Sequence, residues 1–531
     1  MARKGACCIS QLCIFTVVIL LHQTHEIQSA KILGMFPLSA ASHNNIFSAL
    51  TKELAVRGHH LTIITPHPIK NPPANYTQID VSKVVGPHFS KFGNIGIMKM
   101  VEAYVKLLNI TTSICNDVLS MPEMKKLMDP KEMGVNFDLM LISHFFSECF
   151  YPYAHIYDVP VITISPAGSF PTTDGMFGNI ALPSFVPNSF FSFADRMNFV
   201  ERTINLMSVL GVNFYMNFFI YPGHEKVARV YFGDIPPLTE IMKRTSLILL
   251  NNHFTYNYPR PLTPNMIEVG GIHLKSPNPL PKDLQKFMDE AKHGVIYFSM
   301  GSNLKSSTFP VQIRDALMQV FSELKQRVLM KYEGEGPIPG QPPNVKLEKW
   351  LPQTDLLAHP NMKLFITHGG LLSFQEAVAR SVPLIGIPFY GDQELNMQKV
   401  TKLGVGLQVP YTELTKDKLL KAIKEILGDA SYQNKMRLLS AQAMDQPEHP
   451  LQRAAFWTEY VIRHKGAKHI QPASLELGWC QLYMVDAISV LVSIPIILLL
   501  GLYYVMAKCC CRRKTSAKNV PSKSKAKDKR Q

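Results

Sequence analysis

Short apolar runs alternate with segments of helical periodicity along most of the chain. The run "KILGMFP" is ended by Pro37, and apolar residues between 46 and 55 then recur at helical spacing up to Gly58. Another apolar run occupies 61–65. Because a strand, a helix and a strand of these lengths form a βαβ unit, the pattern predicts a parallel sheet.

The alternation continues through two series of strand-like runs. The first series includes 137–143, 159–165 and 246–251, and the second begins at Gly294. A Pro-rich stretch with little periodicity separates them, as is typical of a linker. We therefore predict an α/β protein with two doubly wound, Rossmann-like domains. The predicted bounds are 31–275 for the N-terminal domain, 276–289 for the linker, 290–450 for the C-terminal domain and 451–475 for a helical segment that crosses back to the first domain.

The N-terminus has the pattern of a secretory signal peptide over residues 1–30. Two basic residues precede the apolar stretch Cys13–Leu21, and small residues follow at Ser29 and Ala30. This apolar stretch is too short to span a bilayer, so we expect cleavage near Ala30. An uncleaved signal anchor is the alternative.

The C-terminus has the pattern of a single transmembrane helix, predicted over 484–507. Ala487–Ala507 is free of charge, and at about 1.5 Å per residue it is long enough for a hydrocarbon core of about 30 Å. Lys508 and three more basic residues follow, which places the tail 508–531 in the cytosol. The expected topology is type I, with the body in the lumen. The final "KDKRQ" resembles a dilysine retrieval signal of the endoplasmic reticulum, or is an ordinary basic tail.

Charge and cysteine usage narrow the class of protein. From Lys508 onward there are ten Lys or Arg and one Asp, a net +9 of the total +15 of the 531-residue chain. The basic character is thus largely a property of the tail, and we expect no nucleic-acid partner. Cys115, Cys149 and Cys480 are the luminal cysteines, so at most one bridge can form among them. The sequence contains no metal-binding spacing of Cys or His, so no metal is expected. Asn75 and Asn109 lie in N-glycosylation sequons.

The stretch "FITHGGLLSFQEA" (365–377) has the pattern of a phosphate-binding junction. A buried strand ends here, two glycines including Gly370 let the backbone approach a ligand, and a helix begins. The N-terminus of a helix favours an anion, and His368 and Ser373 can both donate to a phosphate. Glu376 instead suits the two hydroxyls of a ribose.

Flanking residues extend this pattern to a whole nucleotide sugar. Trp350 and Gln353 precede the strand, and an indole can stack on a planar base. Asp392 and Gln393 follow the next strand, and a carboxylate beside an amide suits vicinal sugar hydroxyls.

The segment 350–393 resembles the signature of the UDP-glycosyltransferases, membrane-bound enzymes of the GT-B fold, and its details are most similar to arthropod members. "FSMGS" (298–302) and "QRAAFWTEYVIRHKGA" (452–467) extend the likeness. The resemblance implies an inverting, metal-independent transfer. It also implies the following roles: Trp350 for stacking on uracil, Ser302 and Gln353 for the nucleotide, His368, Gly370 and Ser373 for the diphosphate, Glu376 for the ribose, and Asp392 and Gln393 for the donor sugar.

Inversion by direct displacement needs a general base. His43, on the loop after the first strand, matches the catalytic histidine of the family. The acid expected to orient it is replaced by Ser143. Three outcomes are open: Glu148 substitutes as the carboxylate, which we favour, His43 acts without an acid, or catalysis is weak or absent.

These patterns predict a UDP-glycosyltransferase of the endoplasmic reticulum membrane. It would transfer a hexose, expected to be glucose, from a UDP-sugar co-substrate to a hydroxyl of a small lipophilic acceptor, in a detoxification-type conjugation without a cofactor. Residues 170–221 are crowded with Phe, Met and Tyr, which fits core packing, an apolar pocket or a membrane-facing loop. A nucleotide-sugar-binding pseudoenzyme or partner subunit is the alternative, and a membrane receptor for an apolar ligand is a third reading. Homo- or hetero-oligomers are left open.

Overall fold

The computed structural model describes residues 29–516 except 39, 93–99, 190, 192, 303 and 390. The expected signal peptide, apart from its last two residues, and the tail from 517 onward lie outside the described residues. The chain divides into two units, a body up to Pro472 and a C-terminal unit from Ala473.

The first sheet of the body contains seven parallel strands in the order β3-β2-β1-β4-β5-β6-β7. The central strands β4 and β5 are buried at every position, as expected of strands covered on both faces. Their bounds are β1 Lys31–Met35, β2 His60–Thr65, β3 Tyr76–Asp80, β4 Leu139–Ser143, β5 Val161–Ser165, β6 Thr245–Leu250 and β7 Met266–Glu268.

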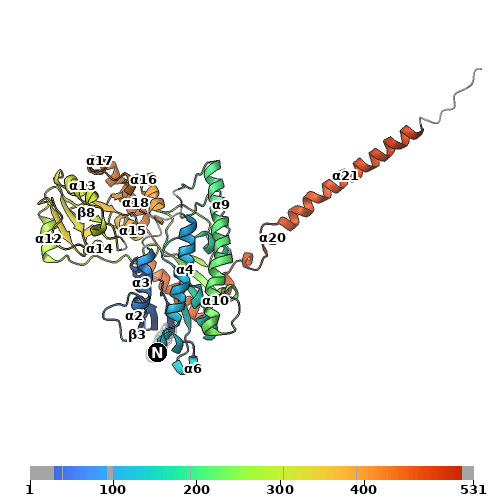
Figure 1. The fold of residues 1–531 in the computed structure, drawn as a ribbon, viewed down its shortest axis with the longest axis horizontal. Coiled ribbons are helices and arrows are strands. Elements are labelled where there is room, and N and C mark those ends of the chain that lie inside the picture. The colour runs from blue at the N-terminus through green and yellow to red at the C-terminus, as the bar shows by residue number, and fades with distance from the viewer. Residues whose placement is uncertain are drawn as a thin grey trace, which may run out of the picture. The chain divides into compact units, whose positions relative to one another are not determined.

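Helices cover both faces of this sheet, with one hydrophobic core on each side (Figure 1). Leu33 and Met140 face one core, and Ile32 and Leu139 face the other, because successive strand residues point to opposite faces. The main helices are α2 Ala41–Val56, α3 Ser82–Phe92, α4 Met100–Leu119, α9 Phe199–Tyr215 and α10 Tyr221–Phe232, and the shorter ones are α5 Pro122–Lys126, α6 Pro130–Met133, α7 Pro152–Ile156, α8 Pro171–Met176 and α11 Leu238–Met242.

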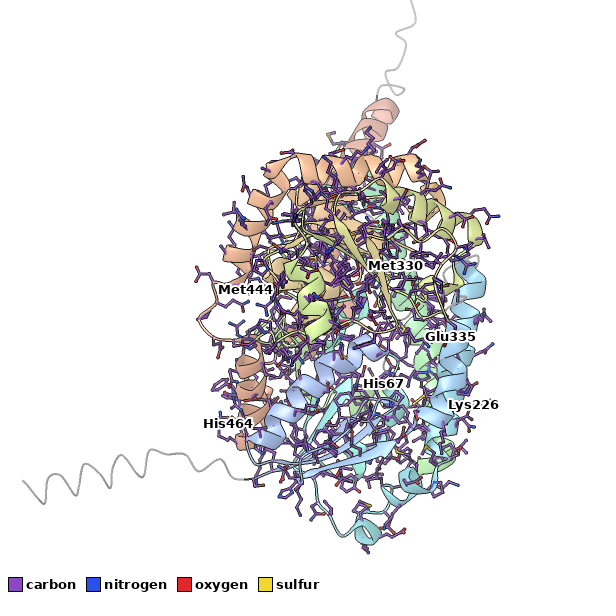
Figure 2. All side chains as sticks on the ribbon, turned by 90° about the vertical axis from the view of Figure 1, so that its left-hand side faces the viewer. His67, Lys226, Met330, Glu335, Met444 and His464 are labelled. Carbon is purple, nitrogen blue, oxygen red and sulfur yellow. A yellow bond between two sulfur atoms is a disulfide. The ribbon has the colours of Figure 1, made fainter. Side chains whose placement is uncertain are left out.

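The second sheet contains six parallel strands in the order β10-β9-β8-β11-β12-β13. Its strands are β8 Val295–Ser299, β9 Arg327–Lys331, β10 Val345–Glu348, β11 Met362–Thr367, β12 Leu384–Gly386 and β13 Gly406–Gln408. Its helices are α12 Lys282–Asp289, α13 Val311–Ser322, α14 Gln353–Leu357, α15 Leu371–Ala379, α16 Gln393–Leu403, α17 Lys416–Gly428 and α18 Ala430–Met444. Figure 2 shows the side chains that fill this part of the body, among them the buried Met330 of β9. Two parallel α/β domains confirm the predicted fold class.

Helix α19 (Pro450–Arg463) follows the second domain and packs against α2 of the first. Ala454 and Val461 enter the first domain's core, and Glu459 pairs with Arg57 at 3.1 Å. The residue bounds assigned to the domains and linker remain predictions.

The C-terminal unit contains the helix α21 (Val485–Ser516). Within it, Val485–Cys509 is long and apolar enough to cross a membrane. By length and composition alone, Phe199–Phe232 in the body meets the same criterion. Along α9, Phe199, Met207 and Leu210 are exposed. Part of the apolar crowding in 170–221 therefore lies on the surface instead of in a core.

Candidate functional site

The predicted donor residues gather at the carboxyl edge of the second sheet. Ser302 follows β8, Trp350 follows β10, His368 follows β11, and Asp392 follows β12. Parallel strands end at one edge, so four separate loops converge there. Ser302 and Trp350 are exposed, and the Trp350 ring, at 74% relative exposure, is open to a planar ligand.

Gln353, Ser373 and Glu376 form one hydrogen-bonded cluster. Nε2 of Gln353 donates to Oε2 of Glu376 at 2.8 Å and to Oγ of Ser373 at 3.2 Å. The hydroxyl of Thr354 donates to the other carboxylate oxygen at 3.3 Å. Burial raises the pKa of Glu376, and the bonds from Gln353 and Thr354 oppose that rise. The carboxylate keeps lone pairs for further donors, such as the hydroxyls of a ribose.

His368 lies against two glycines. A Cβ added at Gly301 would meet the imidazole Cε1 at 2.5 Å, and one at Gly370 would meet Nε2 at 2.5 Å. Only glycine at these two positions leaves room for the imidazole ring, which explains on steric grounds why glycine occurs there. Burial, helped by the charge of Lys331, lowers the pKa of His368 to about 4. A neutral imidazole still carries one N–H that can donate to a phosphate.

Helix α15 begins directly beside this ring. Its N-cap is Gly370, which provides no side-chain cap for the first N–H groups. These groups are therefore available to a ligand, and the positive end of the helix dipole favours an anion there.

Lys331 is a site residue that the sequence reasoning missed. It ends β9 and is buried, and its Nζ donates to the carbonyl of Gly301 at 2.7 Å. Glu333 pairs with it at 3.0 Å, and the Trp350 ring centroid is 5.6 Å away. Its place at the carboxyl end of a strand was a signal that could have identified it.

Asp392 and Gln393 lie at the start of α16. Oδ2 of Asp392 accepts a hydrogen bond from Asn396 at 2.9 Å, and Oε1 of Gln393 accepts from the backbone of Phe389 at 2.8 Å. Burial raises the pKa of Asp392. The structure thus places both side chains where β12 opens onto its helix.

His43 occupies the first turn of α2, at the carboxyl edge of the first sheet. Its buried Nδ1 has no hydrogen-bond partner among the described residues, and its ring lies 5.5 Å from that of Phe145. Burial, with a smaller effect of the neighbouring His67, lowers the pKa of His43 to about 4. The imidazole is therefore neutral at pH 7 and can accept a proton.

The carboxylate of Glu148 is hydrogen-bonded to a different histidine, His224. Nδ1 of the buried His224 is 2.9 Å from Glu148, and Nε2 is 3.1 Å from the hydroxyl of Thr111. The described hydrogen bonds and ion pairs include no pairing of Glu148 with His43. Ser143, at the expected position of the acid, accepts from the backbone of Phe145 at 3.3 Å. His224 is 76 residues from Glu148 in the chain, so no local sequence pattern could predict this pair.

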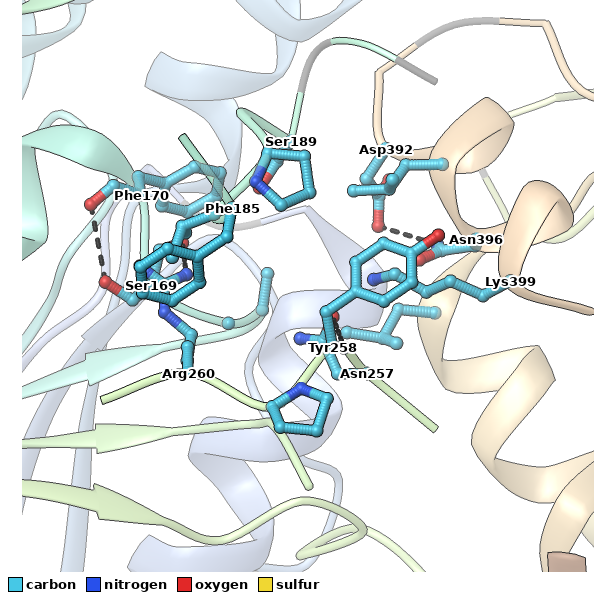
Figure 3. Close-up of a pocket in the computed structure, with 17 residues that line it drawn as sticks. Ser169, Phe170, Phe185, Ser189, Asn257, Tyr258, Arg260, Asp392, Asn396 and Lys399 are labelled. Atoms are coloured by element: carbon cyan, nitrogen blue, oxygen red, sulfur yellow. Dashed lines mark hydrogen bonds between the residues drawn. The ribbon is translucent and has the colours of Figure 1, made fainter. Parts of the chain in front are cut away.

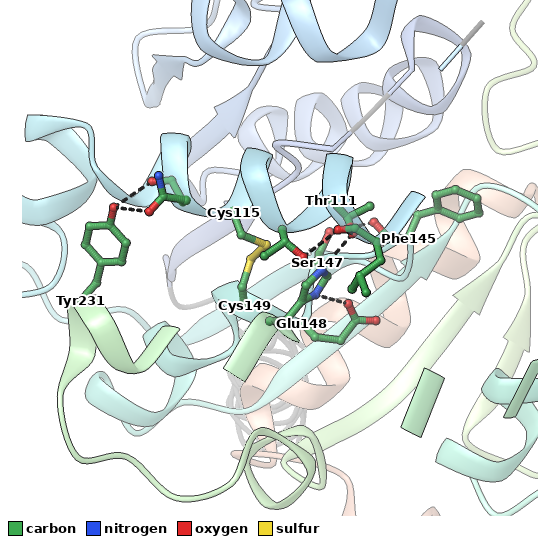
Figure 4. Close-up of a disulfide and its surroundings, with 11 residues drawn as sticks. Thr111, Cys115, Phe145, Ser147, Glu148, Cys149 and Tyr231 are labelled. Carbon is green, nitrogen blue, oxygen red and sulfur yellow. Dashed lines mark hydrogen bonds and ion pairs between the residues drawn. A yellow bond between two sulfur atoms is a disulfide. The ribbon is translucent and has the colours of Figure 1, made fainter. Parts of the chain in front are cut away.

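The loop that carries Glu148 is also tied covalently. A disulfide joins Cys115 of α4 to Cys149 of the short 3-10 helix η2 (Glu148–Phe150) (Figure 4). This is one bridge among the three cysteines considered, and Cys480 is free.

The two sequon asparagines differ in their surroundings. The side-chain nitrogen of Asn75 donates to the carbonyls of Ala55 and His59 at 2.8 and 2.7 Å. Asn109 lies exposed on α4. Of the two, Asn109 presents its amide more freely.

Comparisons with known proteins show the family of the chain. Residues 31–523 match the family model described as "UDP-glucoronosyl and UDP-glucosyl transferase". The chain is 40% identical over 470 residues to UDP-glucosyltransferase 2 of Dactylopius coccus, which covers 87% of this chain and 90% of that protein. It is 29% identical over 523 residues to UDP-glucuronosyltransferase 2B7 of Homo sapiens, and this match covers 93% of this chain and 96% of that protein.

Solved structures show the same fold at low identity. The calicheamicin glycosyltransferase CalG4 superposes with a TM-score of 0.54 at 18% identity, covering 82% of this chain and 99% of that one. A UDP-glucosyltransferase from Polygonum tinctorium superposes with a TM-score of 0.53 at 16% identity, covering 82% of this chain and 99% of that one.

Proposed function

Because the chain belongs to the family of UDP-glucuronosyl and UDP-glucosyl transferases, we propose that it is an inverting transferase of a hexose, namely glucose, from its UDP-sugar to a hydroxyl of a small lipophilic acceptor. The observation that carries this proposal is the convergence of Gln353, Ser373 and Glu376 beside the uncapped start of α15. A neutral His43 in the first turn of α2 supplies a candidate base in the other domain. The similarity to an insect glucosyltransferase favours glucose as the sugar, and conjugation of foreign compounds is the role that fits a lipophilic acceptor.

In the proposed reaction His43 removes the proton from the acceptor hydroxyl. The acceptor oxygen forms a bond to the anomeric carbon as the bond from that carbon to the UDP oxygen breaks, which inverts the centre. Charge that develops on the diphosphate is stabilised by the N–H groups of α15, the imidazole of His368 and the hydroxyl of Ser373. Asp392 and Gln393 hold the sugar, and Trp350 stacks on the base.

In this proposal His43 acts without a paired carboxylate. Two observations support that view over the Glu148 substitution: Nδ1 of His43 has no hydrogen-bond partner within the described part of the chain, and His224 engages Glu148. A neutral imidazole with lowered pKa is a weaker base, so we expect a modest turnover number.

We also propose that α21 anchors the protein in the endoplasmic reticulum membrane with its body in the lumen and a glycan on Asn109. The apolar stretch Val485–Cys509 supports the anchor, and the exposure of Asn109 supports the glycan site. The donor is a co-substrate, and we expect no metal, because charge on the diphosphate already has protein partners.

The test is a transfer assay with the full chain in microsomes, UDP-glucose, and a panel of phenols and flavonoids. The wild-type protein should form glucosides, and His43→Ala should lower kcat about 10²–10⁴-fold while UDP affinity stays within about twofold. His60→Ala, a change at the exposed first residue of β2, is the matched control and should keep full activity.

Full activity of His43→Ala would refute the assignment of the base. Binding of UDP-glucose by the wild-type protein without any glucoside would instead favour the pseudoenzyme or partner-subunit alternative. The observation that suggests this alternative is Ser143, which occupies the position of the expected acid.

A further inference from the structure

A pocket lies between the two domains of the body, beside the proposed sugar site (Figure 3). Its volume is about 590 Å³, a value that includes space open to solvent. One wall belongs to α16, whose residues Asp392, Leu395, Asn396 and Lys399 share one helix face at i, i+3, i+4 and i+7. First-domain loops form the opposite wall with residues from 167–170, 185–189 and 257–260.

Lys399 is the exceptional residue of this pocket. Its side chain is buried, at 7% relative exposure, yet Nζ has no hydrogen bond or ion pair among the described residues. Its described neighbour is the ring of Tyr258, whose centroid is 5.5 Å away. An ammonium on a mostly buried side chain, without a described hydrogen bond or ion pair, favours an anionic ligand at this position.

Other donors in the same pocket are also unsatisfied. The hydroxyl of Tyr258 and Nε of Arg260 are buried without a hydrogen-bond partner among the described residues. The charge of Arg260 is already balanced, because its guanidinium pairs with Asp174 at 2.6 Å. Asp392 is the acidic group that lines the pocket, and it is held by Asn396. Of the two cations in the lining, Lys399 is therefore the one without a hydrogen bond or ion pair to any residue that the structure describes.

The remaining lining is apolar and leads toward His43. Phe170, Phe185, Val186 and Pro187 line the first-domain side. The ring of Phe170 is 6.0 Å from that of Phe145, which is 5.5 Å from the ring of His43. An aromatic ligand against this wall would extend from Lys399 toward the proposed base.

We propose that this pocket receives acceptors that are aromatic acids, with their apolar body against Phe170 and Phe185 and their carboxylate on Lys399. This inference rests on the proposed transfer reaction and specifies its substrate class. Tyr258 adds a neutral donor to the same carboxylate. Burial lowers the pKa of Lys399 to about 8, an effect that the carboxylate of Asp392 opposes, so the ammonium is largely protonated at neutral pH. The Phe170–Phe145–His43 continuity favours the acceptor over a carboxylated donor sugar as the source of the anion.

The test compares 4-hydroxycinnamic acid with its neutral methyl ester as acceptors, using the full chain and UDP-glucose. For Lys399→Met, the ratio of KM for the acid to KM for the ester should rise about tenfold, since one charge-assisted contact is lost. Lys399→Arg should largely restore the ratio. Lys421→Met, a change at an exposed lysine of α17 outside the pocket lining, is the matched control and should leave the ratio unchanged.

Equal changes in KM for acid and ester, or no change at all, would overturn the proposal. A discrimination that appears only when UDP-glucuronate replaces UDP-glucose would also overturn it, since Lys399 would then serve the donor. If the wild-type protein glucosylates neither these two compounds nor any member of the phenol and flavonoid panel, the proposed function fails. Equilibrium binding of the acid and the ester to the UDP-loaded wild type and Lys399→Met then still decides the role of Lys399.

Discussion

At the scale of single residues, Glu376 illustrates how neighbours keep a buried carboxylate available. Gln353 and Thr354 hold both of its oxygens through neutral donors. The nearest basic group is the imidazole of His273 at 3.8 Å, and burial lowers the pKa of His273 to about 4. The carboxylate is thus oriented without a full positive charge against it, and it can accept hydroxyl donors from a ligand.

Replacing Glu376 by Gln should weaken the affinity for UDP about 10–100-fold, because a ribose would lose charge-assisted hydrogen bonds. Titration calorimetry with UDP measures the effect. Glu394→Gln, at an exposed glutamate in the first turn of α16, should bind UDP like the wild-type protein. Unchanged affinity in Glu376→Gln would show that the ribose lies elsewhere.

At the scale of elements, the segment around η2 is held to α4 and α10 by two kinds of link. The disulfide joins η2 to α4, and the hydrogen-bonded series Thr111, His224 and Glu148 joins α4, α10 and η2. Both links are buried in the first domain. Glu148 therefore has a structural reason to be present that is independent of catalysis.

Replacing Glu148 by Ala should lower the free energy of unfolding by about 1–3 kcal/mol, because it leaves Nδ1 of the buried His224 without its hydrogen-bond partner. Denaturant unfolding measures the change. Glu123→Ala, at an exposed glutamate of α5, should change stability by no more than about 0.5 kcal/mol. If Glu148→Ala loses turnover while its stability is unchanged, Glu148 is catalytic as the sequence first indicated.

At the scale of the whole molecule, contacts between the two domains assemble one site from both. Gln375 of α15 donates to Asn251 and to the hydroxyl of Tyr256 at 3.1 Å each. Helix α19 returns to α2, where Glu459 binds Arg57. These contacts hold the second domain's ligand edge against first-domain loops, and the pocket of Lys399 lies between them.

Buried histidines in both domains make the folded body sensitive to acid. Burial lowers the pKa to about 4 for His43, His144, His273 and His368. Between their ordinary pKa of about 6.5 and about 4, the unfolded chain binds more protons than the folded one, so stability falls as pH falls. At pH 5 each histidine costs about 2 kcal/mol of stability.

The melting temperature of the full chain should therefore decrease steadily from pH 6.5 to pH 4.5. His144→Gln, which can keep a hydrogen bond to Thr173, should give a shallower decrease. A melting temperature independent of pH over this range would contradict the burial of these groups.

The sequence by itself determined the features that depend on neighbouring residues. Strand and helix periodicity predicted two parallel α/β domains, and the glycines beside His368 predicted a helix N-terminus suited to a phosphate. The chemistry of the flanking residues and the resemblance of 350–393 then predicted Glu376 and Asp392 as donor-site residues. Such features are readable because strand, turn and helix propensities act over a few positions.

Only the tertiary structure decided which distant side chains meet. It paired Glu148 with His224 and enclosed Lys399 opposite Phe170 and Tyr258. It also left Nδ1 of His43 without a hydrogen-bond partner among the residues that the structure describes. Partner choice depends on how helices and loops far apart in the chain pack together. Burial, which sets the pKa values of these groups, likewise exists only once both domains have folded.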